Sequence, residues 1–278
     1  MQSLADQVIV VTGAGSGMGA ATARLLAADG ARVVLVGRQA EALDAVAAEI
    51  AASGGRAYAR ASDITDADAM AALVDWVHAE LGAVDVLVNN AGASSLVRNP
   101  LYLPEDQLAA VLDVNLVAVF RLVRLVLPDM LARGSGTILT VSSVAALNPG
   151  ILGGAAYGAA KAGVRNFMTF LHNTFRAEGL RAITVLPGEA DTPILDKRPR
   201  PPEPAERADM LQPEDVAEVI GMALRLPARA CAQEIVLYPT RPRDTSVDVA
   251  VGLLVGAPES VTYRDTRDGL AHPPSVGA

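Results

Sequence analysis

The chain has 278 residues, of which 23 are Lys or Arg and 31 are Asp or Glu, so its net charge is −8. Hydrophobic residues make up 51% of the sequence and charged residues 19%, which excludes an intrinsically disordered chain and provides for a large core. The negative net charge argues against a general nucleic-acid binder, because such proteins need a basic face for phosphates.

Cysteine, histidine and lysine are all scarce. The single cysteine, Cys231, excludes a disulfide framework, and three scattered histidines make a metal site unexpected. The first residues lack the basic segment of a signal peptide, and no apolar run reaches the roughly 18–20 residues of a membrane span. We therefore expect a cytoplasmic protein without a metal. Only Lys161 and Lys197 are lysines, and this Ala- and Arg-rich usage indicates a high-GC bacterial genome, in which a lysine is more informative than usual.

Apolar runs of strand length alternate with helical patterns from residue 7 to about residue 240. In chain order the predicted elements are strand Gln7–Thr12, helix Gly17–Asp29, strand Arg32–Val36, helix Gln39–Ala52, strand Arg56–Arg60, helix Asp66–Leu81, strand Val84–Val88, helix Gln107–Arg133, strand Thr137–Val141, helix Ala155–Glu178, strand Ala182–Leu186, helix Pro213–Leu226 and strand Glu234–Tyr238. This alternation predicts a single α/β domain of the Rossmann type. Its doubly wound parallel sheet has about seven strands and helices on both faces.

Two segments depart from the alternation. Residues 193–212 are rich in proline and charge and are too long for an ordinary connection, so we interpret them as a substrate lid or a disordered loop. Residues 241–278 follow the last strand as a C-terminal extension, and their apolar piece, Val247–Ala257, is too short to span a bilayer. We expect the domain to occupy residues 1–240 and the extension to be partly disordered or part of an oligomer interface.

A glycine-rich turn, TGAGSGMG, occupies residues 12–19 between the first strand and the first helix. Gly13, Gly17 and Gly19 allow a tight turn, close approach of the backbone to a pyrophosphate and close packing of helix on strand. A turn of this kind can also serve geometry alone, but its position in the first βα connection predicts a dinucleotide site. The turn lacks the Gly-Lys-Ser/Thr of a triphosphate loop, which disfavours kinase or GTPase chemistry.

The end of the second strand bears on the choice of cofactor. A site for NAD usually has an acidic residue here that binds the ribose hydroxyl, but this chain has Gly37 followed by Arg38. Arg38 is suited to pairing with the 2′-phosphate of NADP, although it could also be a solvated loop cation. The sequence therefore favours NADP(H) over NAD(H).

Tyr157 and Lys161 lie four residues apart, on the same side of a predicted helix. A phenol is a poor base at neutral pH, and a nearby cation lowers its pKa. The alternative is a structural tyrosine packed on a lysine stem.

Ser142 and Ser143 end the fifth strand, where a hydroxyl can hold a substrate oxygen or simply form a turn. Neither serine lies in a G-x-S-x-G elbow, which excludes that type of hydrolase.

Taken together, the motifs resemble those of the classical short-chain dehydrogenase/reductase family over about residues 5–240. Besides the glycine turn and the Tyr-x-x-x-Lys pair, the sequence has Asp63-Ile64 after the third strand and NNAG at residues 89–92 after the fourth. Asn115 lies on the following helix, and Pro187-Gly188 precedes Thr192 as in the family's PGxxxT segment.

The resemblance implies Tyr157 as general acid/base, Ser143 as the residue that steadies the substrate oxygen, and Lys161 as a ribose ligand that lowers the tyrosine pKa. It implies that Asn115 holds a water linking Lys161 to solvent. The cofactor-binding residues that it implies are Gly13, Gly15, Ser16, Gly17, Met18, Gly19, Arg38, Asp63, Ile64, Asn90, Ala91, Gly92, Tyr157, Lys161, Pro187, Gly188, Ala190 and Thr192.

The sequence also departs from the family pattern. Ser143 and Tyr157 are one residue further apart than in most members, so Ser142 remains a weaker candidate, and the segment after the last strand lacks the usual Asp-Gly-Gly. We expect an enzyme that transfers hydride between NADP(H) and a small secondary alcohol or ketone. The alternatives are an NAD-linked dehydrogenase and a non-catalytic dinucleotide sensor.

Members of the family that the sequence resembles are commonly dimers or tetramers, so we expect a homo-oligomer. The predicted substrate pocket is lined by residues 94–96 and 148–152 and by the lid. Within the lid, Arg198 and Arg200 are either ligands of an anionic substrate or, as we favour, a solvated run of charge.

Overall fold

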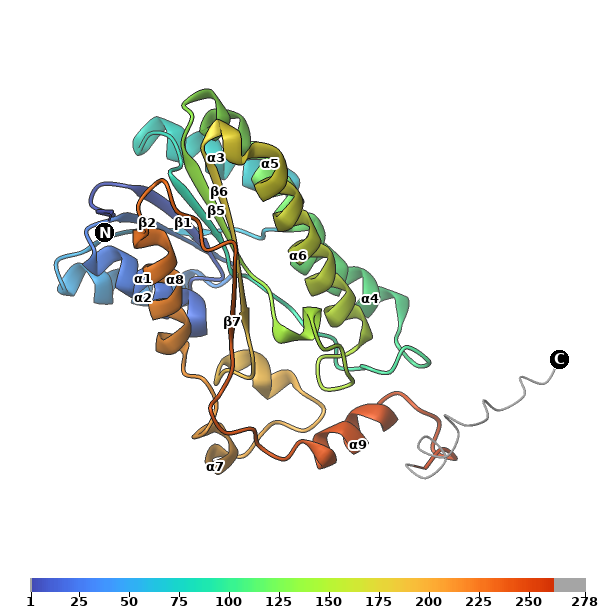
Figure 1. Ribbon diagram of the computed structural model, residues 1–278. Helices are drawn as coiled ribbons and strands as arrows, with labels where there is room; N and C mark the ends of the chain where they lie inside the picture. Colours follow the sequence, from blue (N-terminus) through green and yellow to red (C-terminus); the bar gives the residue numbers. More distant parts are fainter. Residues whose placement is uncertain (1, 263–278) are drawn as a thin grey trace.

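One parallel sheet with helices on both sides forms the body of the protein in the computed structural model, which describes residues 2–262 (Figure 1). The strand order is β3-β2-β1-β4-β5-β6-β7, and every neighbouring pair is parallel. The strands are β1 (Val8–Thr12), β2 (Arg32–Gly37), β3 (Arg56–Ala61), β4 (Val86–Asn89), β5 (Gly136–Val141), β6 (Leu180–Pro187) and β7 (Glu234–Leu237). The predicted fold class is confirmed.

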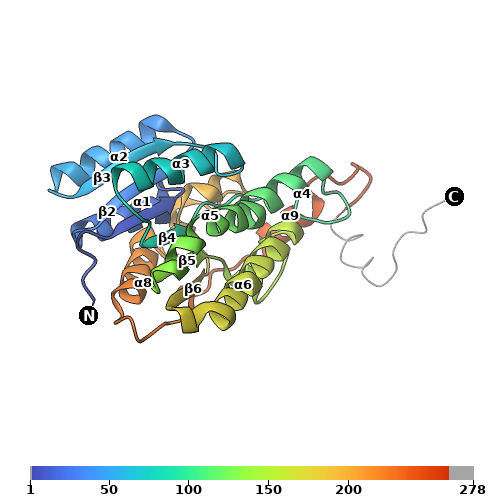
Figure 2. The ribbon, with the colours of Figure 1, turned by 90° about the horizontal axis from the view of Figure 1, so that it is seen from above.

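The central strands β1, β4 and β6 are buried on both faces, and their successive residues point to opposite sides of the sheet. Ile9 and Val11 of β1 face one core, and Val8 and Val10 face the other. The first core is covered by α1 (Gly17–Ala28), α2 (Ala40–Ala52) and α8 (Pro213–Arg225), and the second by α3 (Ala67–Glu80), α5 (Ala118–Ala132) and α6 (Ala155–Phe175). Figure 2 shows the same two layers from above.

The strand order reverses between β1 and β4, which makes the carboxyl ends of these two strands the topological switch point of the sheet. The glycine turn follows β1, and the NNAG segment follows β4. Ligands of open parallel sheets bind at this type of position.

The long helix predicted for residues 107–133 is wrong in one respect. The segment consists of α4 (Glu105–Leu112), a single π-helical turn (Asp113–Val117) and α5. The other predicted boundaries agree with the structure to within three residues, and α6 is followed by a 3₁₀ turn at Arg176–Glu178. The π-turn moves Asn115 into the interior, as described below.

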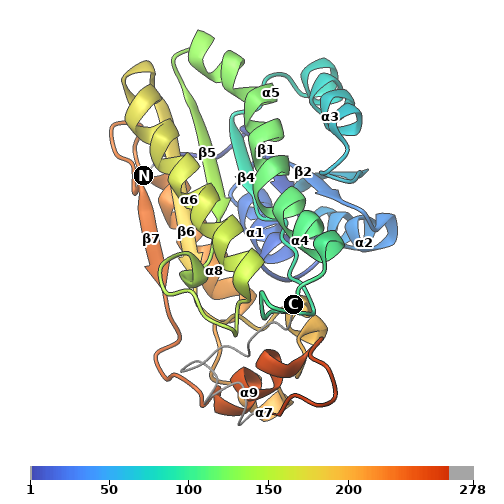
Figure 3. The same cartoon turned by 90° about the vertical axis from the view of Figure 1, so that its right-hand side faces the viewer.

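The lid and the start of the C-terminal extension are more ordered than the sequence predicts. Residues 193–212 contain a 3₁₀ turn (Pro193–Lys197) and the short helix α7 (Pro204–Arg207), and the extension contains α9 (Ser246–Leu254). Helices α7 and α9 lie close together beyond the carboxyl edge of the sheet (Figures 1 and 3). Residues 263–278 of the predicted extension lie outside the described residues. None of the described helices is long and apolar enough to cross a membrane.

Candidate active site

The glycine turn joins β1 to α1 at the centre of the carboxyl edge. Gly13 has a φ of +66°, a conformation that favours glycine. A Cβ on Gly19 would lie 2.2 Å from the carbonyl oxygen of Gly13, so the turn closes only with glycine there. Ser16 precedes α1 without capping it through its side chain, which leaves the first N–H groups of the helix available to an anion. Gly15, Gly17 and Met18 complete the turn.

Asn90 fastens this turn to the end of β4. Its Nδ2 donates hydrogen bonds to the carbonyl oxygens of Thr12 (3.0 Å) and Gly13 (3.3 Å). In return, the Thr12 hydroxyl accepts hydrogen bonds from the N–H groups of Asn90 (3.0 Å) and Ala91 (3.1 Å). The Asn90 side chain therefore shapes the dinucleotide crevice from within the protein.

Arg38 and Asp63 lie near each other at the ends of β2 and β3. Arg38 is exposed and forms no salt bridge with the described residues. The Asp63 carboxylate accepts hydrogen bonds from the N–H and the hydroxyl of Thr65, and these bonds, together with the Arg38 charge, hold its pKa below the ordinary value despite partial burial. Ile64 is buried beside them.

Tyr157, Lys161 and Ser143 converge where β5 ends against α6. The Lys161 Nζ lies 5.5 Å from the centre of the Tyr157 ring and donates a hydrogen bond to the carbonyl oxygen of Val141 (2.9 Å). Ser143 forms a side-chain hydrogen bond with Tyr157. The buried Ser142 instead donates its hydroxyl to the carbonyl oxygen of Lys161 (2.9 Å), so of the two serines it is Ser143 that adjoins the phenol.

The electrostatics of this group differ from the expectation. Burial raises the pKa of Tyr157, and the hydrogen bond from Ser143 and the charges of Arg198 and Arg98 offset part of that rise. Lys161 is not among the groups that lower it. Burial instead lowers the pKa of Lys161 to about 8. The lowering of the tyrosine pKa by Lys161 therefore stays a prediction, and the cations whose charges do lower it here, Arg198 and Arg98, lie on loops.

Asn115 lies in the π-turn and is almost fully buried. Its Nδ2 donates to the carbonyl oxygens of Ala93 (2.7 Å) and Val111 (2.8 Å), and its Oδ1 accepts from the Ala93 N–H (3.3 Å). Both Asn115 Oδ1 and Lys161 Nζ lie against the backbone of Gly92. Asn115 thus fixes the loop after NNAG and borders the same glycine as Lys161.

The segment after β6 crosses the glycine turn. A Cβ on Gly17 would lie 3.1 Å from Thr192 Cγ2. The Gly188 N–H donates to the carbonyl oxygen of Leu237 (2.7 Å), and Ala190 forms a β-bridge with Leu211. Pro187 to Thr192 therefore lie at the same crevice as the glycine turn.

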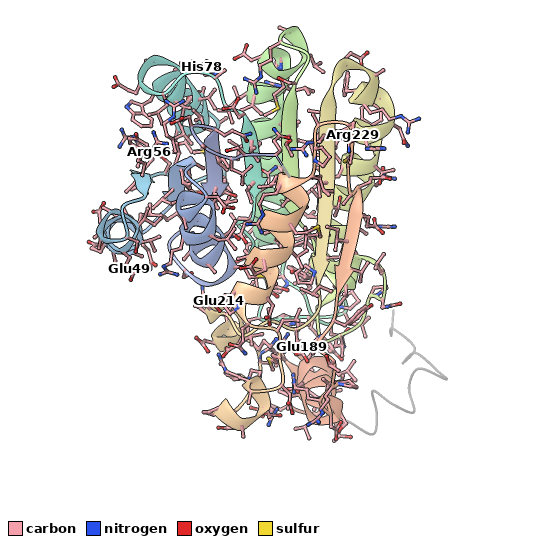
Figure 4. All side chains as sticks on the ribbon, turned by 60° about the vertical axis from the view of Figure 1, so that its left-hand side comes forward. Glu49, Arg56, His78, Glu189, Glu214 and Arg229 are labelled. Carbon is pink, nitrogen blue, oxygen red and sulfur yellow. The ribbon has the colours of Figure 1, made fainter. Side chains whose placement is uncertain are left out.

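Sequence reasoning missed a cluster of charges that joins the lid to α9, here called the lid cluster. Its members are Glu189, Arg198, Arg200, Glu206, Arg243 and Asp248. Arg198 pairs with Glu189 (2.5 Å), and Arg200 with Asp248 (2.9 Å). The expectation of a solvated run of charge is therefore wrong. Figure 4 shows Glu189 where the main body meets this layer.

The interior of the lid cluster is largely shielded from solvent. The side chains of Arg243 and Asp248 are only 8% and 4% exposed and lie 2.5 Å apart. Although burial raises it, Arg243 and Arg198 hold the pKa of Glu189 below the ordinary value. A sequence signal existed, because Asp248 is the only charge in the otherwise apolar segment of α9.

A doubly wound parallel sheet with a glycine turn and a Ser-Tyr-Lys group at its carboxyl edge defines an oxidoreductase that uses a nicotinamide dinucleotide. Residues 7–202 match the short chain dehydrogenase family. The chain belongs to the short-chain dehydrogenase/reductase family and is an NAD(P)-dependent enzyme acting on CH–OH or C=O groups of small molecules.

Relatives of known name and structure agree with this assignment. The chain is 42% identical to cis-4-hydroxycyclohexanecarboxylate dehydrogenase of Sinomonas cyclohexanicum, over 79% of this chain and 90% of that protein. It is 35% identical to cyclohexanol dehydrogenase of an Acinetobacter species, over 79% of this chain and 88% of that protein. A metagenomic short-chain oxidoreductase solved in complex with NADP is 37% identical and superposes with a TM-score of 0.75, covering 87% of this chain and 100% of that one.

Proposed function

We propose that the protein interconverts a secondary alcohol on an alicyclic ring and the corresponding ketone, with NADP(H) as cofactor and Tyr157 as general acid/base. The observation that carries this proposal is the contact of Ser143 with Tyr157, beside Lys161 at the carboxyl end of β5. The names of two relatives support a ring alcohol as substrate and differ in whether the ring bears a carboxylate.

In this proposal the substrate oxygen lies between Tyr157 and Ser143. Ser143 donates a hydrogen bond to that oxygen, and Tyr157 as phenolate takes the hydroxyl proton while the carbonyl forms. In the reverse direction the neutral phenol returns the proton. A nicotinamide cofactor held at the glycine turn would provide the acceptor or donor for the hydride of the carbinol carbon. Arg98 and Arg198 favour the phenolate electrostatically, against the burial that opposes it.

The residues present suit a dinucleotide, because the uncapped start of α1 offers N–H groups to a pyrophosphate. Asp63 and Ile64 would adjoin the adenine, Lys161 the nicotinamide ribose, and the Pro187–Thr192 segment the carboxamide. Arg38, unpaired among the described residues, would bind the 2′-phosphate, and Gly37 leaves no carboxylate to repel it. An NADP complex of a relative supports the same preference.

Asn115 would hold a water molecule next to Lys161. Its Oδ1 keeps one lone pair beyond its bond to Ala93 and lies against Gly92 together with the Lys161 ammonium. A water held there would connect Lys161 with solvent and allow the proton of Tyr157 to leave the site.

Turnover of cyclohexanol and of cis-4-hydroxycyclohexanecarboxylate with NADP⁺ or NAD⁺ tests the proposal. We expect ketone formation with NADP⁺ and a loss of about 10²- to 10⁴-fold in kcat for Tyr157→Phe, because proton transfer by a positioned side chain contributes about that much. NADPH binding, followed by fluorescence, should persist. Tyr58→Phe is the matched control, since Tyr58 lies on β3 against Trp76. Near-normal turnover by Tyr157→Phe would contradict the mechanism.

A further inference from the structure

Arg98 is a buried cation on the loop that follows NNAG. Its residue is only 4% exposed. Its backbone carbonyl accepts a hydrogen bond from the N–H of Ala155 (3.1 Å), and its Cβ and Cγ pack on Gly154. Arg98 therefore lies against the first turn of α6, the helix that carries Tyr157. The loop is fixed, because the neighbouring Asn99 donates from Nδ2 to the carbonyl oxygen of Leu253 in the α9 helix (3.0 Å).

The guanidinium of Arg98 has one buried nitrogen without a hydrogen-bond partner. Nη1 donates to the carbonyl oxygen of Leu152, but the buried Nε has no hydrogen-bond partner. Arg98 also has no carboxylate within salt-bridge distance among residues 2–262. Burial, with the charge of Arg198 nearby, lowers the Arg98 pKa to about 10, although the more distant charges of Tyr157 and Asp248 oppose that shift.

The neighbouring arginines show that this lack of a partner is particular to Arg98. Arg198, Arg200 and Arg243 of the lid cluster each pair with at least one carboxylate. A buried charge without a partner destabilises the folded state, so an uncompensated one beside an active site calls for an anion supplied from outside.

A small cleft lies on this arginine. It is lined by the apolar side chains of Ile151 and Leu152 on one side and by Arg98, Arg198, Arg200 and Asp248. The charges of Arg98 and Arg198 both lower the pKa of Tyr157, and Arg98 packs on Gly154, the N-cap of the helix that carries Tyr157. The cleft is about the size of one water molecule, so it suits a carboxylate oxygen against Arg98 rather than a hydrocarbon ring.

We propose that Arg98 binds a carboxylate on the substrate, so that the enzyme acts on hydroxy acids or keto acids in preference to neutral alcohols. This inference rests on the proposed alcohol dehydrogenase function. The Nε–Nη2 edge of a guanidinium has the geometry to hold both oxygens of a carboxylate. Asp248 and Glu189 already neutralise most of the remaining positive charge, which favours a singly charged carboxylate over a doubly charged phosphate.

Binding and turnover separate this inference from the proposed function. Cyclohexanecarboxylate and the neutral cyclohexanecarboxamide, neither of which has the reacting hydroxyl, are titrated calorimetrically into the NADP⁺ complex. We expect the carboxylate to bind about 10- to 100-fold more tightly than the amide, as a hydrogen bond to a charged group contributes about 1.5–3 kcal/mol. Arg98→Met should abolish this preference, and Arg98→Lys should retain only part of it. Arg229→Met, which removes an exposed arginine at the opposite end of the molecule (Figure 4), should leave it unchanged.

In turnover, Arg98→Met should lower kcat/KM for cis-4-hydroxycyclohexanecarboxylate about 10- to 100-fold more than kcat/KM for cyclohexanol, because loss of the Arg98 charge near Tyr157 affects both alcohols and loss of a carboxylate contact affects only the acid. Equal binding of the two probes by the unaltered enzyme overturns the inference, even if Arg98→Met fails to fold. Equal losses on both alcohols would show a structural role for Arg98 and overturn it as well. Carboxylate binding that depends on Arg98 without oxidation of either alcohol would support the anion site and overturn the proposed function.

Discussion

At the scale of single residues, Arg38 separates the two cofactors. Its guanidinium is exposed at the end of β2 and is held by no salt bridge in the described chain, so it is free to meet a 2′-phosphate. We expect Arg38→Ala to weaken NADPH binding by about 10- to 100-fold, the effect of one charged hydrogen bond, and to change NADH binding by less than about threefold. Fluorescence titration with both dinucleotides measures this. Equal losses for NADPH and NADH would contradict the assignment of Arg38 to the phosphate.

Lys161 makes stability depend on pH. Burial lowers its pKa to about 8 from an ordinary value of 10.5. Between these values the unfolded chain binds more protons than the folded protein, so the free energy of unfolding rises with pH. Below pH 8 both states are protonated, and the folded protein bears the full cost of the buried charge.

The unaltered protein should therefore gain about 1 kcal/mol of stability over Lys161→Met between pH 7 and pH 9, since one pKa unit corresponds to about 1.4 kcal/mol. Urea unfolding of the cofactor-free proteins at both pH values provides the difference. The comparison with Lys161→Met removes contributions of other titrating groups. A difference that stays constant across this range would show that Lys161 keeps an ordinary pKa.

At the scale of elements, the glycine turn couples folding to cofactor binding. A Cβ on Gly19 would lie 2.2 Å from a backbone oxygen of the turn and 2.5 Å from Nδ2 of Asn90. Gly19→Ala must therefore push α1 away from β1 and displace the side chain that shapes the crevice. We expect a loss of about 1–3 kcal/mol in unfolding free energy and loss of measurable NADPH binding.

Gly150→Ala is the matched control for Gly19→Ala, because a Cβ at Gly150 meets nothing within 4 Å. It should leave both the unfolding free energy and NADPH affinity close to those of the unaltered protein. Retention of NADPH binding by Gly19→Ala would show that the turn can rearrange around a side chain.

The elements also show what sequence can predict. Strands such as β1 are predictable because their β-branched runs are buried on both faces, and that pattern is local. The π-turn was not predictable, because it depends on bonds from Asn115 to Ala93, which is far along the chain. Helix α9 was missed for a similar reason, since Asp248 finds its partners in the lid and in Arg243. In the candidate site, the motifs identified Tyr157, but nothing in the sequence marks Arg98 as buried.

At the scale of the whole molecule, the segments that form the candidate site gather at the carboxyl edge of the sheet. The carboxyl edge gathers the loops after β1 to β6, and the lid cluster joins α9 to the segment that follows β6. Helix α9, which follows the predicted domain boundary at residue 240, therefore packs beside the candidate site. That boundary stays a prediction, although α9 packs on the site from outside it, with Gly252 near Ile151.

The outer surfaces of α5 and α6 present aromatic side chains to solvent. Phe120 is 43% exposed and stacks on Phe167 with ring centres 3.6 Å apart, and Phe170 is 56% exposed on the next turn of α6. Exposed aromatic side chains gathered on two neighbouring helices are a candidate association site. In a dimer with a two-fold axis, each copy would bury its aromatic surface against that of the other copy. We therefore expect a homodimer through α5 and α6.

Substitution of both exposed rings tests this expectation. Phe120→Glu combined with Phe170→Glu would place carboxylates inside the proposed interface, where desolvation and mutual repulsion oppose association. We expect light scattering after size exclusion to show a dimer for the unaltered protein and a monomer for the double variant. Leu101→Glu is the control, because Leu101 is 77% exposed but lies in the turn before α4 and not on α5 or α6. A monomeric unaltered protein would show that the protein forms no dimer. A double variant that still dimerises would show that the interface lies on another surface, since the double substitution changes only the aromatic one.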